Sequence, residues 1–274
     1  MNLGASAVVL RPRGIAEILD LACALATSRA LGLFARLACF TLLPGLVLCV
    51  GLRHVFDWHW AAVWAVAIAW GSVAQGAFTI AVGRLIFSEA LTARRALALF
   101  AKRLPSYLGA TLLSKAILAA SGLVFFVLTP VAWPRIMFVH EACLLEGAGA
   151  GASVSRANAF VNGRAIGAFG LLLALLFTQG AFVVVAELLG DGLMSEVLQL
   201  GKPLGSLLHD GGSVQALVGL FASFAFVATA RFLGYIDQRT RTDGWDVQLR
   251  FMAIAARAAG EDGERERGRE RQAA

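Results

Sequence analysis

Long apolar blocks separated by short polar segments fill most of the chain. A helix needs about 20 apolar residues to cross the hydrocarbon core of a bilayer, with a lower limit of about 17. The weakest block, 131–146, lies at or below this limit, and Pro105 is expected to open the block before it. The pattern predicts an all-α integral membrane bundle of about six transmembrane helices. The predicted spans are about 31–52, 60–83, 106–128, 131–146, 164–189 and 214–236.

Amphipathic segments lie between the apolar blocks, with charged residues on one side of a helix and apolar residues on the other. They cover 13–29, 89–104 and 147–163. Helices of this kind tend to lie in the membrane interface. The polytopic membrane domain is predicted to extend over 1–259. The charged, low-complexity tail, 260–274, is expected to be disordered.

The composition favours a chain solvated by lipid. Of the 274 residues, 58% are hydrophobic and 15% are charged, whereas soluble domains carry about 25% charged residues. The net charge of +6 could indicate a nucleic-acid partner. The basic residues, however, cluster beside the apolar blocks, and membrane topology explains that placement better. No nucleic-acid partner is expected.

Lysines and arginines concentrate in alternate connecting segments. The positive-inside rule places such segments in the cytoplasm. The first loop offers only Arg53 and the fifth only Lys202. This alternation requires an even number of crossings, six rather than five. It predicts a multi-pass protein of the bacterial cytoplasmic (inner) membrane with both termini in the cytoplasm. The basic residues of the cytoplasmic segments include Arg11, Arg13, Arg29, Arg84, Arg94, Arg95, Lys102, Arg103, Arg156 and Arg164.

Four polar residues are singled out as candidates inside predicted spans, where an ionisable group costs about 2.5–3.5 kcal/mol. Lys115 lies nine residues into the third span, and Glu141 lies five residues from the inner end of the fourth. Their depths allow a Lys115–Glu141 ion pair that ties the two spans together. Simple snorkelling and a role in transport are the alternatives. Gln75 and Gln179 lie near the midplane, where interhelical hydrogen bonds are more typical than a substrate path.

Charges of both signs follow the last span, at Asp237, Arg239, Arg241 and Asp243. One interpretation is a solvated helix start with Asp243 as its N-cap. The other is a docking surface at the cytoplasmic face for a partner protein or for anionic lipid headgroups. Arginines beside a membrane gain about 1 kcal/mol each near such headgroups.

Motifs for catalysis or metal binding do not stand out. The chain shows no Ser-His-Asp arrangement, HExxH, P-loop or GxGxxG at a strand–helix turn, so neither an enzyme nor a cofactor is expected. His54, Asp57 and His59 share the first loop but lack a fourth ligand. No metal site is predicted.

Three stretches of the chain resemble the motifs of one membrane-protein family. They are Glu146-Gly147 with Ala152-Ser153-Val154-Ser155-Arg156 and Asn162-Gly163-Arg164, the segment from Tyr235 to Asp246, and the opening from Leu10 to Asp20. They resemble a bacterial polytopic family related to the membrane domain attached to some glycerophosphoryl diester phosphodiesterases. The chain departs from that pattern at Ala157, where serine is usual, and at Asp243, where glutamate is usual.

The resemblance would cover the chain up to about residue 259 and implies architecture more than activity. The chain leaves no room for the phosphodiesterase barrel of about 250 residues, so that activity is not carried over. The leading hypothesis is a non-catalytic scaffold or accessory protein, with membrane lipids and a cytoplasmic protein as partners. The alternative is a transporter or lipid-handling protein. Its signature would be one polar cavity that joins Lys115, Glu141, Gln75 and Gln179.

Overall fold

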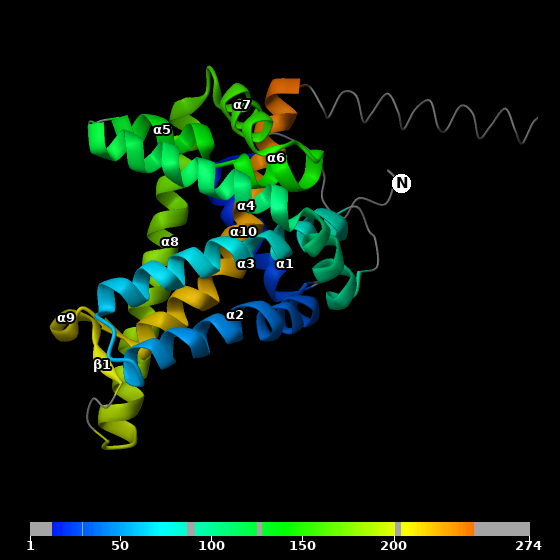
Figure 1. The fold of residues 1–274 in the computed structure, drawn as a ribbon. Coiled ribbons are helices and arrows are strands. Elements are labelled where there is room, and N and C mark those ends of the chain that lie inside the picture. Colours follow the sequence, from blue (N-terminus) through cyan, green and yellow to red (C-terminus); the bar gives the residue numbers. More distant parts are fainter. Residues whose placement is uncertain (1–12, 29, 87–90, 125–127, 201–203, 244–274) are drawn as a thin grey trace, which may run out of the picture.

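The computed structural model describes residues 13–28, 30–86, 91–124, 128–200 and 204–243, and in these residues the chain is almost wholly α-helical (Figure 1). This confirms the predicted all-α class. The elements are α1 (Ile15–Thr27), α2 (Leu31–His54), α3 (Trp60–Ile86), α4 (Ala93–Val124), α5 (Thr129–Ile136), α6 (Val139–Glu146), α7 (Ala150–Val161), α8 (Ala165–Gly192), the π-helical turn η3 (Leu193–Val197), β1 (Gly205–Ser206), α9 (Leu207–Asp210), β2 (Gly212–Ser213) and α10 (Val214–Asp243).

Five of the described helices are long and apolar enough to cross a membrane: α2, α3, α4, α8 with its extension η3, and α10. They correspond to five of the six predicted spans and are compatible with a multi-pass membrane protein. The last one is longer than predicted. It continues to Asp243, seven residues beyond the expected end at 236.

The predicted span 131–146 is not a continuous helix. It consists of α5 and α6, each eight residues long and separated at Met137 and Phe138. Pro134 lies inside α5, where it removes one backbone hydrogen bond and crowds the preceding turn. Eight residues extend a helix by only about 12 Å. Both short helices pack against α4, so the chain turns back along α4 in two pieces rather than in one span.

The expected boundary at Pro105 is also absent. α4 passes through this proline without interruption, so the residues of 89–104 that the structure describes as helical belong to the same helix as the third span. Phe100 and Tyr107 lie on either side of Pro105, both are buried, and their ring centroids are 5.4 Å apart. This packing holds the two parts of α4 together despite the missing hydrogen bond.

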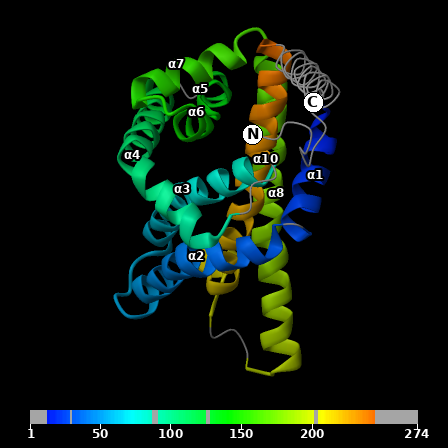
Figure 2. The same ribbon diagram turned by 90° about the vertical axis from the view of Figure 1, so that its right-hand side faces the viewer.

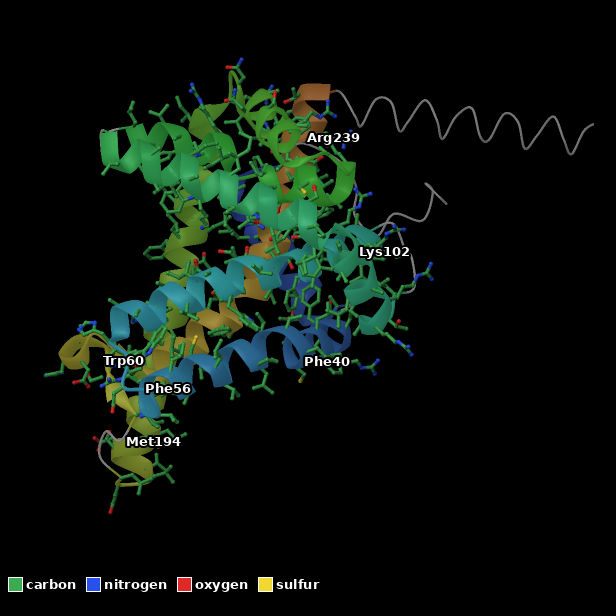
Figure 3. All side chains as sticks on the ribbon, viewed as in Figure 1. Phe40, Phe56, Trp60, Lys102, Met194 and Arg239 are labelled. Atoms are coloured by element: carbon green, nitrogen blue, oxygen red, sulfur yellow. The ribbon has the colours of Figure 1, made fainter. Side chains whose placement is uncertain are left out.

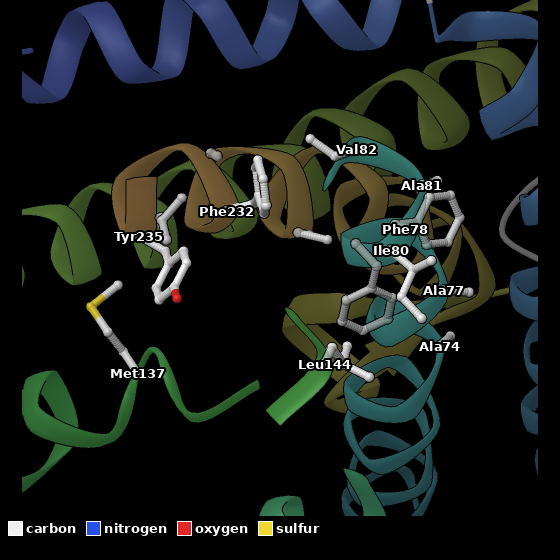
Figure 4. Packing of buried hydrophobic residues seen from close by; sticks show 14 of the residues in the cluster. Ala74, Ala77, Phe78, Ile80, Ala81, Val82, Met137, Leu144, Phe232 and Tyr235 are labelled. Atoms are coloured by element: carbon white, nitrogen blue, oxygen red, sulfur yellow. The ribbon is translucent and has the colours of Figure 1, made fainter. Parts of the chain in front are cut away.

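The core of the molecule is built around α10. In its most apolar window, 72% of the residues are buried, compared with 22% in α8 and 28% in α2. α10 contacts α8, α3, α1 and α2, and Figure 2 shows it running beside α8 and α1. Side chains of α3, α6 and α10 meet around Phe78, Leu144 and Phe232 (Figure 4).

Two glycines allow close approaches between α10 and its neighbours. A side chain at Gly219 would meet the backbone of Phe182 in α8, and one at Gly71 of α3 would meet the ring of Phe224. Small residues at such positions let helices pack tightly in a membrane, where no hydrophobic driving force brings them together.

The two ends of the bundle differ in chemistry. The arginine-rich end gathers the start of α4, α7 and the end of α10. The opposite end carries the first loop and the small antiparallel pair β1–β2, in which Gly205 pairs with Ser213. Figure 3 shows Lys102 and Arg239 at the former, and Phe56, Trp60 and Met194 at the latter. At the opposite end the Trp64 indole donates a hydrogen bond to the Gly211 carbonyl at 3.0 Å.

Candidate functional site

A cavity of about 570 Å³ lies among α3, α4, α8 and α10, and the broken segment α5–α6 completes its wall. Most of its lining is apolar, as expected for a small-molecule site. α5 and α6 contribute Trp133, Ile136 and His140, with Met137 between them. The polar side chains that line it are Ser72, Gln75, Ser114, Lys115, His140, Gln179 and Arg231.

Three of the four intramembrane candidates reach this cavity, each from a different helix. Gln75 comes from α3, Lys115 from α4 and Gln179 from α8. The Gln179 amide donates a hydrogen bond to Ser223 Oγ of α10 at 3.1 Å. This is an interhelical hydrogen bond of the kind expected for that residue.

The fourth candidate, Glu141, is completely buried beside α10 and binds Arg231. The distance from Arg231 Nε to Glu141 Oε1 is 2.6 Å. The expected Lys115–Glu141 ion pair is therefore not formed. Because α6 starts anew after the break at Met137, its first turn places Glu141 against α10 instead.

Sequence reasoning did not single out Arg231, although it stands in an apolar span. It lies five residues before the predicted end at 236, and Glu141 lies five residues before the predicted end at 146. Opposite charges at equal depth are the signal that could have identified this pair, because charges inside membranes usually pair with one another.

The pair is joined through only one nitrogen and one oxygen. Arg231 Nη2 and Glu141 Oε2 are both buried and have no hydrogen-bond partner among the described residues. A bidentate arginine–carboxylate pair would have used both. A buried donor without an acceptor costs about 1–3 kcal/mol. Since Arg231 also lines the cavity, the part of its guanidinium outside this buried contact can bind a ligand held there.

Lys115 stands on the cavity wall with its charge uncompensated. In the part of the chain that the structure describes, it has no ion-pair or hydrogen-bond partner. Its neighbours on the wall are fixed by polar contacts. His140 Nδ1 lies 3.4 Å from Thr111 Oγ1, and the Tyr107 hydroxyl donates to the Ser72 carbonyl at 2.7 Å. The lysine is thus a cation without a partner among side chains that are held by hydrogen bonds.

A second buried carboxylate, Glu187 of α8, organises the opposite end. Its Oε1 accepts a hydrogen bond from the Leu207 backbone at 2.7 Å, and its Oε2 accepts one from the Ser213 hydroxyl. Ser213 Oγ in turn accepts from the Ala216 backbone at 2.9 Å, which caps α10. Glu187 was not singled out from the sequence, although an acid inside an apolar block is a sufficient signal.

The stretches that carry the family resemblance meet at the arginine-rich end. Glu146 Oε2 binds Arg156 Nε at 2.7 Å, and Glu146 Oε1 accepts a hydrogen bond from the Tyr235 hydroxyl at 2.6 Å. Arg239 lies 3.4 Å from the same carboxylate and donates to the tyrosine oxygen at 3.2 Å. The first two stretches therefore form one network around Glu146.

The opening stretch joins the same region through Arg13. Asp237 accepts a hydrogen bond from the Arg13 backbone at 2.6 Å and binds Arg241 Nε at 2.8 Å. Arg241 also donates to the Arg13 carbonyl at 2.7 Å. With Arg164, these three residues line a smaller cavity of about 290 Å³.

The docking candidates thus make intramolecular contacts. Asp237 and Arg241 tie α10 to the chain before α1, and Arg239 joins the network around Glu146. Asp243 is the last residue of α10, and its side chain and the residues that follow it lie outside the described part, so its role as an N-cap stays a prediction. A docking role for these residues stays a prediction.

No protein-family model, curated protein or solved structure matches this chain. The resemblance to the polytopic family therefore stays a prediction that rests on the quoted motifs. Among the described residues, no group of three or more histidine, cysteine, aspartate or glutamate side chains could hold a metal ion. The polar cavity is the arrangement from which a function can be argued.

Proposed function

We propose that this protein is a lipid-handling membrane protein that takes an amphiphile from the bilayer into the cavity. The observation that carries the proposal is the meeting of Gln75, Lys115 and Gln179 with Arg231 in one largely apolar cavity. A polar centre within apolar walls matches a molecule with a polar head and an apolar tail.

The size of the cavity supports a small ligand. About 570 Å³ lies within the range of roughly 300–1,000 Å³ that is typical of small-molecule sites. Such a volume suits a headgroup with the first part of its tails, which leaves the rest of the tails in the bilayer.

The rim of the cavity supports entry from the bilayer. Ile68, Leu176 and Val184 line the cavity and are 48%, 38% and 49% exposed on the protein surface. They belong to α3 and α8, two of the candidate membrane spans. Exposed apolar side chains on such helices face lipid, so an amphiphile can enter sideways.

The alternative function suggested by the sequence is therefore favoured over the scaffold. The scaffold hypothesis rested on the lack of a dense intramembrane polar site, and seven polar side chains of the described structure line one cavity. The basic surface that was expected to dock a partner is partly used inside the molecule, at Arg239 and Arg241.

We further propose a bacterial cytoplasmic membrane location with both termini in the cytoplasm. The charge alternation of the sequence supports this orientation. The path of the chain is consistent with it. α5 and α6 return along α4. Hydrogen bonds from Ser106 to Ala148 and from Tyr235 to Glu146 bring together the start of the predicted third span, the segment between α6 and α7, and the last part of α10.

Filling the cavity tests the proposal. Gly180 lines the cavity and has open space where a side chain would begin, so we expect Gly180→Phe to fold and to lose most of the lipid that co-purifies with the protein. Gly51→Phe is the matched control, because Gly51 also has open space around it but lies on α2, away from the cavity. Native mass spectrometry counts the bound lipids. Equal lipid retention by the two variants would contradict the proposal.

A further inference from the structure

The charge on the cavity wall is unbalanced. Lys115 and Arg231 are the charged residues that line the cavity, and none of the described lining residues is acidic. Glu141 lies behind the wall and compensates one of the two positive charges through its contact with Arg231. One positive charge remains without a counter-charge in the described structure.

An uncompensated positive charge is unfavourable inside this cavity. The cavity lies between candidate membrane spans, where water and salt screen charges poorly and an uncompensated ionic group is unfavourable. On the cavity wall, the donors without a partner in the described structure are Lys115 Nζ and the part of the Arg231 guanidinium outside its buried contact with Glu141. One anion with two acceptor oxygens can satisfy both donors and balance the charge.

We infer that the cavity selects an amphiphile whose headgroup is a singly charged oxyanion, held by Lys115 and Arg231. This inference rests on the proposed lipid-handling function and names its ligand class. The chemistry is that of a phosphodiester without a compensating cation, or of a carboxylate. A zwitterionic headgroup fits worse, because its cation would add to the excess positive charge and finds no acidic side chain on the described wall.

The geometry also favours a lipid over an anion dissolved in water. Leu176, Gly180 and Val184, successive turns of α8, line the cavity on the side that is exposed to lipid. The neutral Gln75 and Gln179 can hydrogen-bond ester or hydroxyl oxygens without adding charge. A free phosphate ion would leave the apolar walls in contact with its hydration shell.

Titration with two lipids tests the inference. The purified full chain in detergent micelles is titrated with phosphatidylglycerol and with phosphatidylcholine of the same acyl chains, and bound lipid is counted by native mass spectrometry. We expect phosphatidylglycerol to bind about tenfold more tightly, which corresponds to about 1.4 kcal/mol. Oleate, as a carboxylate, is expected to compete with phosphatidylglycerol.

Variants of the protein test whether the cavity causes the preference for phosphatidylglycerol. Lys115→Met is expected to lose most of the preference and Lys115→Arg to retain it. Lys102→Met is the matched control, since it removes the same charge from the same helix away from the cavity. Arg231→Lys keeps a cation beside Glu141 but removes the guanidinium and its additional donors, so it should lower the preference without unfolding the protein.

The outcomes separate the inference from the proposed function. Equal binding of both lipids, with both still blocked by Gly180→Phe, overturns the anionic selectivity and leaves lipid handling in place. A preference that Lys115→Met and Lys102→Met reduce equally overturns the role of the cavity in it. Displacement of phosphatidylglycerol by inorganic phosphate overturns the assignment to a lipid. Lipid binding that Gly180→Phe does not change would contradict the proposed lipid-handling function itself.

Discussion

Arg231 and Glu141 connect α10 to α6 through a charged contact inside the protein. Removing one partner of a buried ion pair typically costs about 3–5 kcal/mol, because the remaining charge is left without compensation. Replacing both partners with apolar side chains of similar volume is often neutral. The contribution of the pair should therefore appear as a coupling free energy between the two positions, rather than as the effect of either substitution alone.

A double-mutant cycle measures this coupling. We expect Arg231→Met and Glu141→Met each to lower the free energy of unfolding by about 3 kcal/mol. The double variant is expected to lose less than either single variant, since it leaves no buried charge. Equilibrium unfolding of the purified protein in mixed detergent micelles with increasing dodecyl sulfate gives the three values. Effects that simply add in the double variant would argue against a coupled pair.

At the level of single residues, the sequence predicted which residues line the cavity better than it predicted their contacts. A charge or amide inside an apolar block is visible without a structure, which is how Gln75, Lys115 and Gln179 were found. The partner of Glu141 was not predictable in the same way. Distance along a helix gives the depth of a residue, but not the direction in which its side chain points. That direction was set by the break before α6.

Among the helices, α10 is the central one, and hydropathy did not reveal this. Its apolar window has a mean hydropathy of 1.9 and is 72% buried, whereas that of α8 has 2.2 and is 22% buried. Lipid and protein interior are both apolar environments, so hydropathy predicts that a helix spans but not what surrounds it. The small residues of α10 carry more information about its neighbours.

Gly219 of α10 tests the close contact with α8. A side chain there would overlap the backbone of Phe182, which cannot move aside as a flexible side chain could. We expect Gly219→Leu to destabilise the protein by about 1–3 kcal/mol, in line with other overpacked sites. Gly192→Leu is the control, because Gly192 has open space around it at the end of α8. Thermal unfolding in detergent should show a lower midpoint for the first variant only. Equal midpoints would contradict the tight α8–α10 packing.

Two prolines show why the ends of helices were harder to predict than the presence of apolar spans. Pro105 lies within a continuous helix, whereas the segment containing Pro134 breaks shortly after it. Both residues lack the same backbone donor. The difference comes from packing, since buried Phe100 and Tyr107 hold α4 together across its proline. Local sequence describes the donor that is lost, but not the tertiary contacts that compensate for it.

On the scale of the whole molecule, the arginine-rich end is held together by polar contacts, whereas the cavity opens elsewhere in the bundle. Hydrogen bonds and ion pairs around Glu146 and Asp237 fix the arginine-rich end. The cavity lies farther along the bundle, with α10 as one wall and exposed apolar residues of α8 at its rim. This arrangement suits a rigid frame that offers a polar site to molecules in the surrounding lipid.

Photo-crosslinking to a lipid tests the central claim most directly. The protein is reconstituted in vesicles with phosphatidylglycerol that carries a diazirine close to its headgroup, and the labelled peptides are identified after irradiation. We expect labels on α4 near Lys115 and on α8 near Gln179 to exceed those on α2 near Phe40, which is 67% exposed but distant from the cavity. Gly180→Phe should abolish this excess. Labels that simply follow surface exposure, with α2 marked as strongly as the cavity and no effect of Gly180→Phe, would contradict an amphiphile-binding cavity.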